Sequence, residues 1–265
     1  MTLDDIFRVL WDRYRSMAPI APKCRQMLQA RGEAWVVDHV ALRTFGTEGL
    51  GLDSLTRVFT QVGYVETGRY RFSSKRLHAV SLSDSRGERP RVFISCFETN
   101  SLPEELRQEL LALVSSPEGE LRDWFRGERP WRMPSFETYA RLREESEYAA
   151  WLSVFGICAN HFTVAVNALR TVSTIRELNC ILREAGVELN EAGGEVKGSP
   201  ELLLEQSSTM ADRVPVSFSC GRVEEIRSCY MEFAARYEDP KTGALFDGFL
   251  PESADRIFES TDEVG

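Results

Sequence analysis

The feature that most constrains how this chain can fold is an internal repeat, in which the order strand, helix, three strands occurs twice. Two landmarks define its spacing. Aligning His39 with His161 gives an offset of 122 residues, and aligning Gly63 with Gly186, each of which ends the helix of its unit, gives 123. Because a repeat of this kind dictates architecture, we expect two similar units that pack together in one α+β domain.

Hydrophobic periodicity and turn residues divide each unit into its elements. In the first unit we expect a strand at 35–45, a helix at 52–62 and strands at about 64–72, 77–83 and 91–97. In the second unit we expect a strand at 158–166, a helix at about 171–185 and strands at about 201–208, 213–219 and 225–237. Helical patterns occupy 3–16, the residues after Pro22, and 103–113, 121–125 and 135–155.

These elements predict a single domain built from five parts. They are N-terminal helices at 1–34, a first βαβββ module at 35–100, a helical insertion at 101–156, a second βαβββ module at 157–238 and a C-terminal segment at 239–265. Along the first strand of the second module, His161 and Thr163 share one face, whereas Phe162 and Val164 point the other way. This polarity is typical of a cupped sheet with a ligand on one face and helices on the other.

Composition excludes several classes of function. The formal net charge is −9 and Lys and Arg form no cluster, so we expect no nucleic-acid partner. No segment approaches the roughly 20 apolar residues of a membrane span, and the first residues carry no pattern of a signal peptide. Six cysteines without a CxxC pair are typical of reduced thiols, so we expect a cytoplasmic protein. Nothing in the sequence assigns an oligomeric state.

The chain has three histidines, and two of them occupy matched positions in the repeat. Taken singly, a histidine in an apolar strand is more often a hydrogen-bonded core residue. His39 and His161, however, lie in the first strands of the two modules, and a pseudo-twofold packing would bring both imidazoles to one point. Because imidazole is a common ligand of transition metals, the pair predicts a metal site.

A third ligand is expected from the last strand of the second module. Glu232 lies there in an apolar run, where a carboxylate is costly unless it is paired or binds a metal. The alternative is an ion pair with Arg236, two residues further along. Glu205 and Glu98 are weaker rivals for the metal. Two imidazoles and one carboxylate leave coordination positions open, which is the pattern of non-haem ferrous oxygenases.

Two further side chains are expected to bind a substrate. Arg43 lies four residues after His39 on the same strand face, roughly 13 Å away at Cα level, and its guanidinium could hold a carboxylate through two hydrogen bonds. The alternative for Arg43 is a surface salt bridge. His78 could reach the same cavity or could be a core histidine, and we favour the cavity.

Several phrases spread over 35–261 are similar to the 2-oxoadipate dioxygenase/decarboxylase family. They are VDHVALRTF at 37–45, NHFT at 160–163, LEQSST at 204–209, YMEFA at 230–234 and IFEST at 257–261. The resemblance implies a vicinal-oxygen-chelate fold like that of hydroxyphenylpyruvate dioxygenase, with paired βαβββ modules around Fe(II). It implies that His39, His161 and Glu232 are the metal ligands, and that Arg43 is the catalytic arginine that binds the substrate carboxylate.

The same resemblance implies an activity. It is the conversion of 2-oxoadipate, a small 2-oxo acid, with O₂ to 2-hydroxyglutarate and CO₂, as in lysine catabolism. Gln206 and Ser208 would add hydrogen bonds to the substrate. The chain resembles a short form of the family, because well-studied bacterial members have C-terminal additions that shape the substrate pocket.

Three other functions stay open from the sequence. The chain could be a glyoxalase-type isomerase, although such a site usually has a fourth protein ligand. It could be a dioxygenase that acts on another 2-oxo acid, or a non-catalytic module that binds a small acid.

Overall fold

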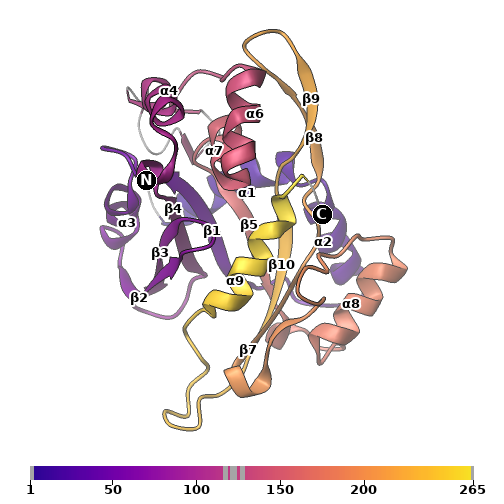
Figure 1. Cartoon of the computed structure of the whole chain (residues 1–265). Coiled ribbons are helices and arrows are strands. Elements are labelled where there is room, and N and C mark those ends of the chain that lie inside the picture. Colours follow the sequence, from indigo (N-terminus) through magenta and orange to yellow (C-terminus); the bar gives the residue numbers. More distant parts are fainter. Residues whose placement is uncertain (1–2, 116–118, 120–123, 126–128, 264–265) are drawn as a thin grey trace.

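In the computed structural model, an eight-stranded sheet forms the centre of the molecule and curls around its inner face (Figure 1). The structure describes residues 3–115, 119, 124–125 and 129–263. The strand order is β2-β3-β4-β1-β5-β10-β7-β6. The first strands of the two modules, β1 and β5, pair antiparallel in the middle, and each pairs parallel with the last strand of its own module, β4 or β10. The predicted α+β architecture of two modules in one cupped sheet is confirmed.

The first module follows the predicted order closely. It consists of β1 (Val37–Phe45), α3 (Leu52–Thr60), β2 (Tyr64–Phe72), β3 (Leu77–Asp84) and β4 (Arg91–Phe97). Gly63 follows α3 with a φ of +102°, and its counterpart Gly186 has a φ of +74°. Both values lie in the left-handed region, where a residue without a Cβ atom ends a helix at little cost. The two landmarks of the repeat therefore have the same conformational role.

The second module differs from the prediction in its later strands. It consists of β5 (Ala159–Ala165), α8 (Ile175–Glu184), β6 (Lys197–Ser199), β7 (Leu204–Ser208) and β10 (Tyr230–Arg236). The expected strand at 213–219 does not join this sheet. Instead, β8 (Arg213–Ser217) and β9 (Val223–Arg227) form a separate hairpin, and the expected strand at 225–237 divides into β9 and β10. The short edge strand β6 takes the vacated place in the module.

Helices also lie outside the two modules. In the described part of the chain they are α1 (Leu3–Met17), α2 (Ile20–Ala30), α4 (Glu104–Val114), α6 (Phe136–Glu145), α7 (Glu147–Phe155) and α9 (Pro251–Phe258). Of these, α1 and α2 pack on the outer face against β5 and β10, together with α3 and α8 of the modules. The ring of Phe162 lies 5.1 Å from Trp11 and 4.9 Å from Tyr14 of α1, as expected for the face of β5 opposite His161. The expected helix at 135–155 is broken at Ser146, whose side chain caps α7 by accepting a hydrogen bond from the amide of Ala149. The expected helix at 121–125 falls largely outside the described residues.

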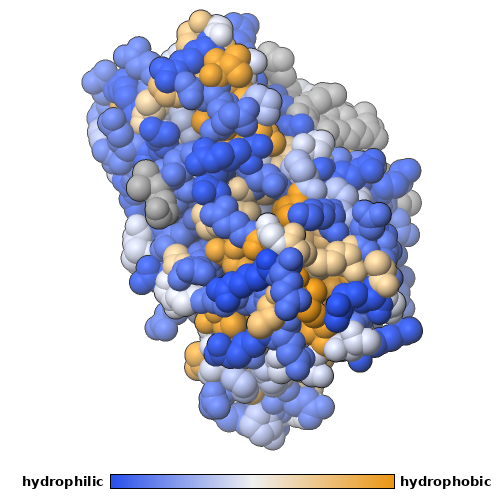
Figure 2. Space-filling view, turned by 90° about the vertical axis from the view of Figure 1, so that its right-hand side faces the viewer, coloured by the Kyte–Doolittle hydropathy of each residue, from blue (hydrophilic) through white to orange (hydrophobic). Residues whose placement is uncertain are grey.

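The C-terminal segment turns back across the inner face of the sheet. Figure 1 shows α9 in front of the strands, and it packs against β2, β6 and β7. A set of short 3-10 turns, at Thr99–Ser101, Val166–Ala168, Pro200–Leu202 and Glu259–Thr261, connects the larger elements. Hydrophilic side chains cover most of the face in Figure 2, in keeping with the acidic composition. In the part of the chain that the structure describes, no helix combines the length and apolar composition of a membrane span.

Candidate metal site

Three adjacent strands of the inner face, β1, β5 and β10, place the site residues in successive rungs. The first rung is His39, Thr163 and Glu232, and the second is Ala41, His161 and Tyr230. Arg43 follows two residues beyond Ala41 on β1. The register therefore arranges the predicted residues along one line, with the expected metal ligands at one end and the arginine at the other.

A β-bulge precedes each histidine in the strand pair β1–β5. Val37 lies opposite Val164 but His39 lies opposite Thr163, so Asp38 is the extra residue on β1. A second shift, between Ala41 and Leu42, makes Asn160 the extra residue on β5. A bulge redirects side chains locally. As a result, the residue before each histidine turns its side chain onto the Nδ1 atom of that histidine.

The Nδ1 contacts fix which ring nitrogen faces the cavity. His39 Nδ1 lies 2.8 Å from Asp38 Oδ2, and His161 Nδ1 lies 3.1 Å from Asn160 Oδ1. Because a carboxylate or amide oxygen can only accept, Nδ1 carries the proton and donates in both cases. In each ring, Nε2 is then the nitrogen that faces Glu232 and would bind a metal.

The three predicted ligands converge on one point. Glu232 Oε1 lies 3.4 Å from His39 Nε2, and Glu232 Oε2 lies 3.1 Å from His161 Nε2. The donor atoms of the three residues all lie within 4.8 Å of one another. Neighbouring donors of a metal bound at ~2.1 Å are about 3 Å apart, so the cluster fits a single divalent ion. The donor set of two imidazoles and one carboxylate suits a non-haem iron site.

Burial shifts the pKa values of two of these groups. It lowers the pKa of His161 well below its usual range, and the nearby positive charges of His39 and Arg43 act in the same direction. His161 is therefore neutral at physiological pH, which is the form that binds metals. Burial also raises the pKa of Glu232, so the metal-free carboxylate is held in an unfavourable environment that a bound cation would relieve.

Asp38 connects His39 to a second buried charge. Its carboxylate accepts two hydrogen bonds from the Arg236 guanidinium, at 2.8 and 2.9 Å. Although burial alone would raise the pKa of Asp38, the hydrogen bond from His39 and the charge of Arg236 outweigh it and lower that pKa. Arg236 also donates to the carbonyl oxygens of Phe246 and Gly248, in the loop before α9. The predicted alternative, an ion pair between Glu232 and Arg236, is wrong because Arg236 pairs with Asp38.

Arg43 is buried and holds unused hydrogen-bonding capacity. Its side chain is 1% exposed, and its guanidinium carbon lies 4.8 Å from the ring of Tyr148 and 4.7 Å from that of Trp151. Nη2 donates to Thr261 Oγ1 at 3.1 Å, whereas Nε and Nη1 have no partner among the described residues. The predicted alternative of a surface salt bridge is wrong for a side chain this deeply buried. Nε and Nη1 therefore keep N–H groups that can donate to the oxygens of a bound carboxylate.

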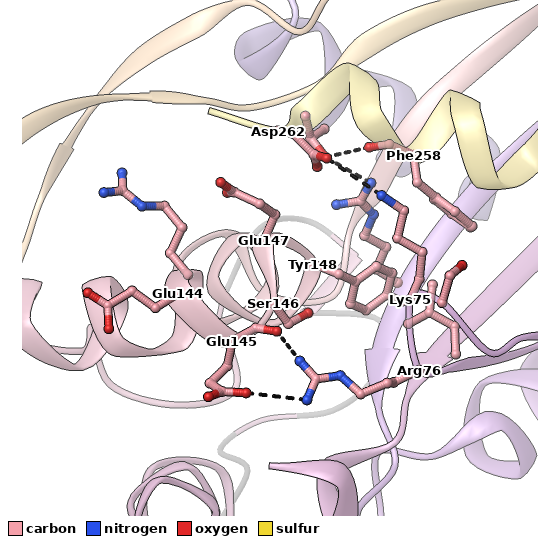
Figure 3. Close-up of a pocket in the computed structure, with 14 residues that line it drawn as sticks. Lys75, Arg76, Glu144, Glu145, Ser146, Glu147, Tyr148, Phe258 and Asp262 are labelled. Carbon is pink, nitrogen blue, oxygen red and sulfur yellow. Dashed lines mark hydrogen bonds and ion pairs between the residues drawn. The ribbon is translucent and has the colours of Figure 1, made fainter. Parts of the chain in front are cut away.

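Two cavities, called hollows below, lie beside the row of residues that runs from Arg43 to the two histidines. A cavity of about 20 Å³ lies at the three predicted metal ligands, and its walls include Phe249, Ile257 and Phe258. A larger pocket of about 250 Å³ reaches Arg43 from outside (Figure 3). Lys75 and Asp262, whose charged groups are 3.6 Å apart, lie at its rim. Phe258 lines both hollows, so it separates the outer pocket from the metal ligands.

The predicted substrate residues on β7 both lie beside the ligands. Gln206 Nε2 donates to Glu232 Oε1 at 2.6 Å, and Gln206 lines the small cavity. Ser208 lies opposite Glu232 in the sheet, and its hydroxyl is hydrogen-bonded at 2.9 Å to that of Ser260 in the C-terminal segment. Gln206 is therefore placed to orient the carboxylate ligand, whereas Ser208 fastens the segment that covers the site.

The structure corrects the expectation for His78. This residue lies on β3 with its side chain 49% exposed, and its Nε2 is 2.6 Å from Glu98 Oε1. It lines neither the metal cavity nor the Arg43 pocket, because its position in β3 points it away from the inner face. Glu98, one of the rival ligands, is thereby occupied at the surface. The other rival, Glu205, accepts a hydrogen bond from Tyr237.

Sequence reasoning missed two parts of the site. One is the pair Asp38 and Asn160, although their matched positions beside the repeated histidines were a visible signal. The other is the C-terminal cover, formed by Phe249 and α9. Its apolar residues Ile257 and Phe258 follow one another in the sequence, and nothing in that pattern tells which face of the sheet they cover.

Comparisons with known proteins agree with this geometry. A model of the 2-oxoadipate dioxygenase/decarboxylase family matches the chain over residues 3–121 and 120–247. The chain is 34% identical over 274 residues to the 2-oxoadipate dioxygenase/decarboxylase of Oryza sativa subsp. japonica, which covers 94% of this chain and 75% of that protein. It is 35% identical over 250 residues to the protein of that name from Arabidopsis thaliana, covering 84% of this chain and 67% of the relative.

A solved structure gives the same result for the fold. The hydroxyglutarate synthase of Oryza sativa in complex with 2-oxoadipate superposes with a TM-score of 0.91 at 32% identity. The match covers 97% of this chain and 91% of that one. The predicted vicinal-oxygen-chelate type of fold is thereby confirmed.

Proposed function

Because the chain belongs to the 2-oxoadipate dioxygenase/decarboxylase family, we propose that it converts 2-oxoadipate with O₂ to 2-hydroxyglutarate and CO₂. The bond between C1 and C2 breaks and C1 leaves as CO₂. One oxygen atom of O₂ enters the new carboxylate and the other enters the hydroxyl group on the adjacent carbon. The observation that carries the proposal is that three potential metal ligands and the buried Arg43, whose Nε and Nη1 have no partner among the described residues, lie on one face of the sheet.

The resident metal in this proposal is Fe(II), held by His39, His161 and Glu232. Bound there, Fe(II) supplies open coordination positions for a 2-oxo acid and the redox chemistry that O₂ requires. The chain contributes the orientation of the ligands. Asp38 and Asn160 hold the two imidazoles with Nε2 toward the cavity, and Gln206 holds one oxygen of Glu232.

Arg43 binds the carboxylate at the far end of the substrate. Its guanidinium is kept in place by aromatic rings and Thr261, so its free N–H groups need no reorganisation to donate to an anion. The distance between Arg43 and the ligands then selects chain length: a diacid must span from the metal to the arginine. The apolar walls of Phe249, Ile257 and Phe258 exclude water from the reacting end.

Substrate entry requires movement of the cover. A cavity of about 20 Å³ accommodates roughly one water molecule and not a six-carbon diacid. Phe258 separates this cavity from the outer pocket that already reaches Arg43. We infer that 2-oxoadipate enters through the outer pocket and displaces Phe258, which joins the two hollows into one site.

The test is oxygen uptake by protein loaded anaerobically with Fe(II) and supplied with 2-oxo acids of four to seven carbons. We expect consumption of O₂ and release of CO₂ and 2-hydroxyglutarate in equal amounts, with 2-oxoadipate the best substrate. His161→Ala should fold but bind little iron, and it serves as the control for metal-dependent turnover. The proposal would be contradicted if His161→Ala consumed O₂ as fast as the wild-type protein. It would also be contradicted if the wild-type protein did not prefer 2-oxoadipate over the other 2-oxo acids.

A further inference from the structure

Tyr230 is a fully buried residue of the inner face whose hydroxyl group makes no hydrogen bond to any described residue. It is the first residue of β10 and lies opposite His161, in the rung next to that of His39 and Glu232. Its ring stacks on the imidazole of His161, with centroids 4.7 Å apart and planes inclined by 29°. The aromatic ring thus has a packing role, but the hydroxyl group has no hydrogen-bond partner in the described part of the chain.

Tyr230 and Arg43 lie on the same face of the sheet, one rung apart. Tyr230 shares a rung with His161 and Ala41, and Arg43 follows two residues beyond Ala41 on β1. Tyr230 also packs with Ile257 of α9, which lines the metal cavity.

Arg43 and Tyr230 are therefore two buried side chains of the inner face, one rung apart, that both carry unsatisfied donors. Nε and Nη1 of Arg43 and Oη of Tyr230 all lack partners among the described residues. Buried donors without acceptors are costly, and proteins retain them mainly where a ligand completes the hydrogen bonds. The shared requirement of these three donors is an anion with several acceptor oxygens.

We propose that the Tyr230 hydroxyl donates a hydrogen bond to the terminal carboxylate of the dicarboxylic substrate, alongside Arg43. This inference rests on the proposed function and deepens it, because it assigns a second residue to recognition of the far end of the substrate. Tyr230 and Arg43 together bind the terminal carboxylate and so determine which length of substrate fits. The ring of Tyr230 also packs against the metal-binding imidazole of His161.

The test compares Tyr230→Phe with Tyr14→Phe. Tyr14 is also fully buried, but its hydroxyl donates at 2.6 Å to the backbone carbonyl of Tyr230, on the opposite side of the same strand. Removing the hydroxyl of Tyr14 breaks a hydrogen bond of the protein, so the urea midpoint of the metal-free variant should fall. Removing that of Tyr230 breaks none, so its midpoint should stay equal to or exceed that of the wild-type protein.

Binding supplies the second measurement. Anaerobic calorimetry with Fe(II)-loaded protein should show affinity for 2-oxoadipate at least ~10-fold weaker in Tyr230→Phe, as expected for loss of a hydrogen bond to a charged group. Affinity for 2-oxohexanoate, which has the same chain without the terminal carboxylate, should stay within about twofold, and Tyr14→Phe should bind both acids normally.

Each other outcome overturns the assignment. Unchanged diacid affinity in Tyr230→Phe, equal losses for both acids, or the same loss in Tyr14→Phe would remove the terminal-carboxylate role. Failure of the proposed function itself is distinguishable, because it shows as wild-type protein that neither binds nor turns over 2-oxoadipate. In that case a lowered urea midpoint in Tyr230→Phe would also refute the claim that its hydroxyl is unsatisfied in the protein.

Discussion

Replacing Asp38 by Ala removes a carboxylate that contacts both a proposed metal ligand and a buried arginine. The substitution deletes the acceptor for His39 Nδ1 at 2.8 Å and the two acceptors for the Arg236 guanidinium at 2.8 and 2.9 Å. Arg236 is 3% exposed, so its charge is left in the interior, where its guanidinium keeps the carbonyl oxygens of Phe246 and Gly248 and the ring of Phe249 as contacts. The matched substitution is Asn160→Ala, in the other copy of the repeat.

The two substitutions should differ in cost. Removing one partner of a buried ion pair costs about 3–5 kcal/mol, because the other charge stays uncompensated. Asn160→Ala deletes one neutral hydrogen bond, at 3.1 Å, and should cost about 1 kcal/mol. The pKa of Asp38 is lowered in the folded protein, so its stabilisation is complete above the unfolded pKa of about 3.9. The difference between wild-type protein and Asp38→Ala should therefore be constant from pH 5 to 8 and shrink only in stronger acid.

Urea unfolding of the metal-free proteins measures these costs, and competition with a chromophoric chelator measures metal affinity. We expect Asp38→Ala to weaken metal binding by roughly 10- to 100-fold, as loss of an outer partner of a ligating histidine does. The effect of Asn160→Ala should be smaller in both measurements. Equal costs for the two variants would refute the reasoning, since they would mean that the buried charge pair contributes no more than the neutral contact.

Three further predictions concern the inner face. Arg43→Ala should raise KM for 2-oxoadipate by roughly 10- to 100-fold with little change for 2-oxohexanoate, and steady-state kinetics with the two acids checks this. Glu232→Gln should weaken metal binding at least ~10-fold by the same chelator competition. Because burial raises the pKa of Glu232, the metal-free carboxylate destabilises the fold increasingly as pH rises above about 4.3. At pH 7, metal-free Glu232→Gln should therefore have a higher urea midpoint than the metal-free wild-type protein. At pH 4 the two midpoints should be equal. Phe93→Glu should bind divalent metal more tightly than wild-type protein and lose oxygen uptake, because a fourth ligand would occupy an open position.

The sequence predicted the parts of this molecule that periodicity and repetition encode. The first module, the positions of His39 and His161 and the face of β5 that carries them follow from alternation and from the offset of the repeat. Strand β6 was missed because three residues, Lys197–Ser199, are too few for any periodic signal and include a glycine. The hairpin β8–β9 was misassigned because alternation predicts a strand but does not identify the sheet it joins. The bulges were invisible, since a shift of one residue changes pairing without changing the hydrophobic pattern.

The register also explains why the repeated modules make an asymmetric site. Ala41 of β1 is the repeat counterpart of Thr163 of β5, and their partners in the parallel strands are Phe93 on β4 and Glu232 on β10. Phe93 is thus the counterpart of Glu232, the proposed carboxylate ligand, and it lines the same cavity. A fully symmetric pair of modules would present two imidazoles and two carboxylates to the metal, which is the four-ligand arrangement expected of an isomerase. With an aromatic ring in place of the second carboxylate, one side of the metal stays open and apolar, which is the arrangement that binding of a 2-oxo acid and O₂ requires.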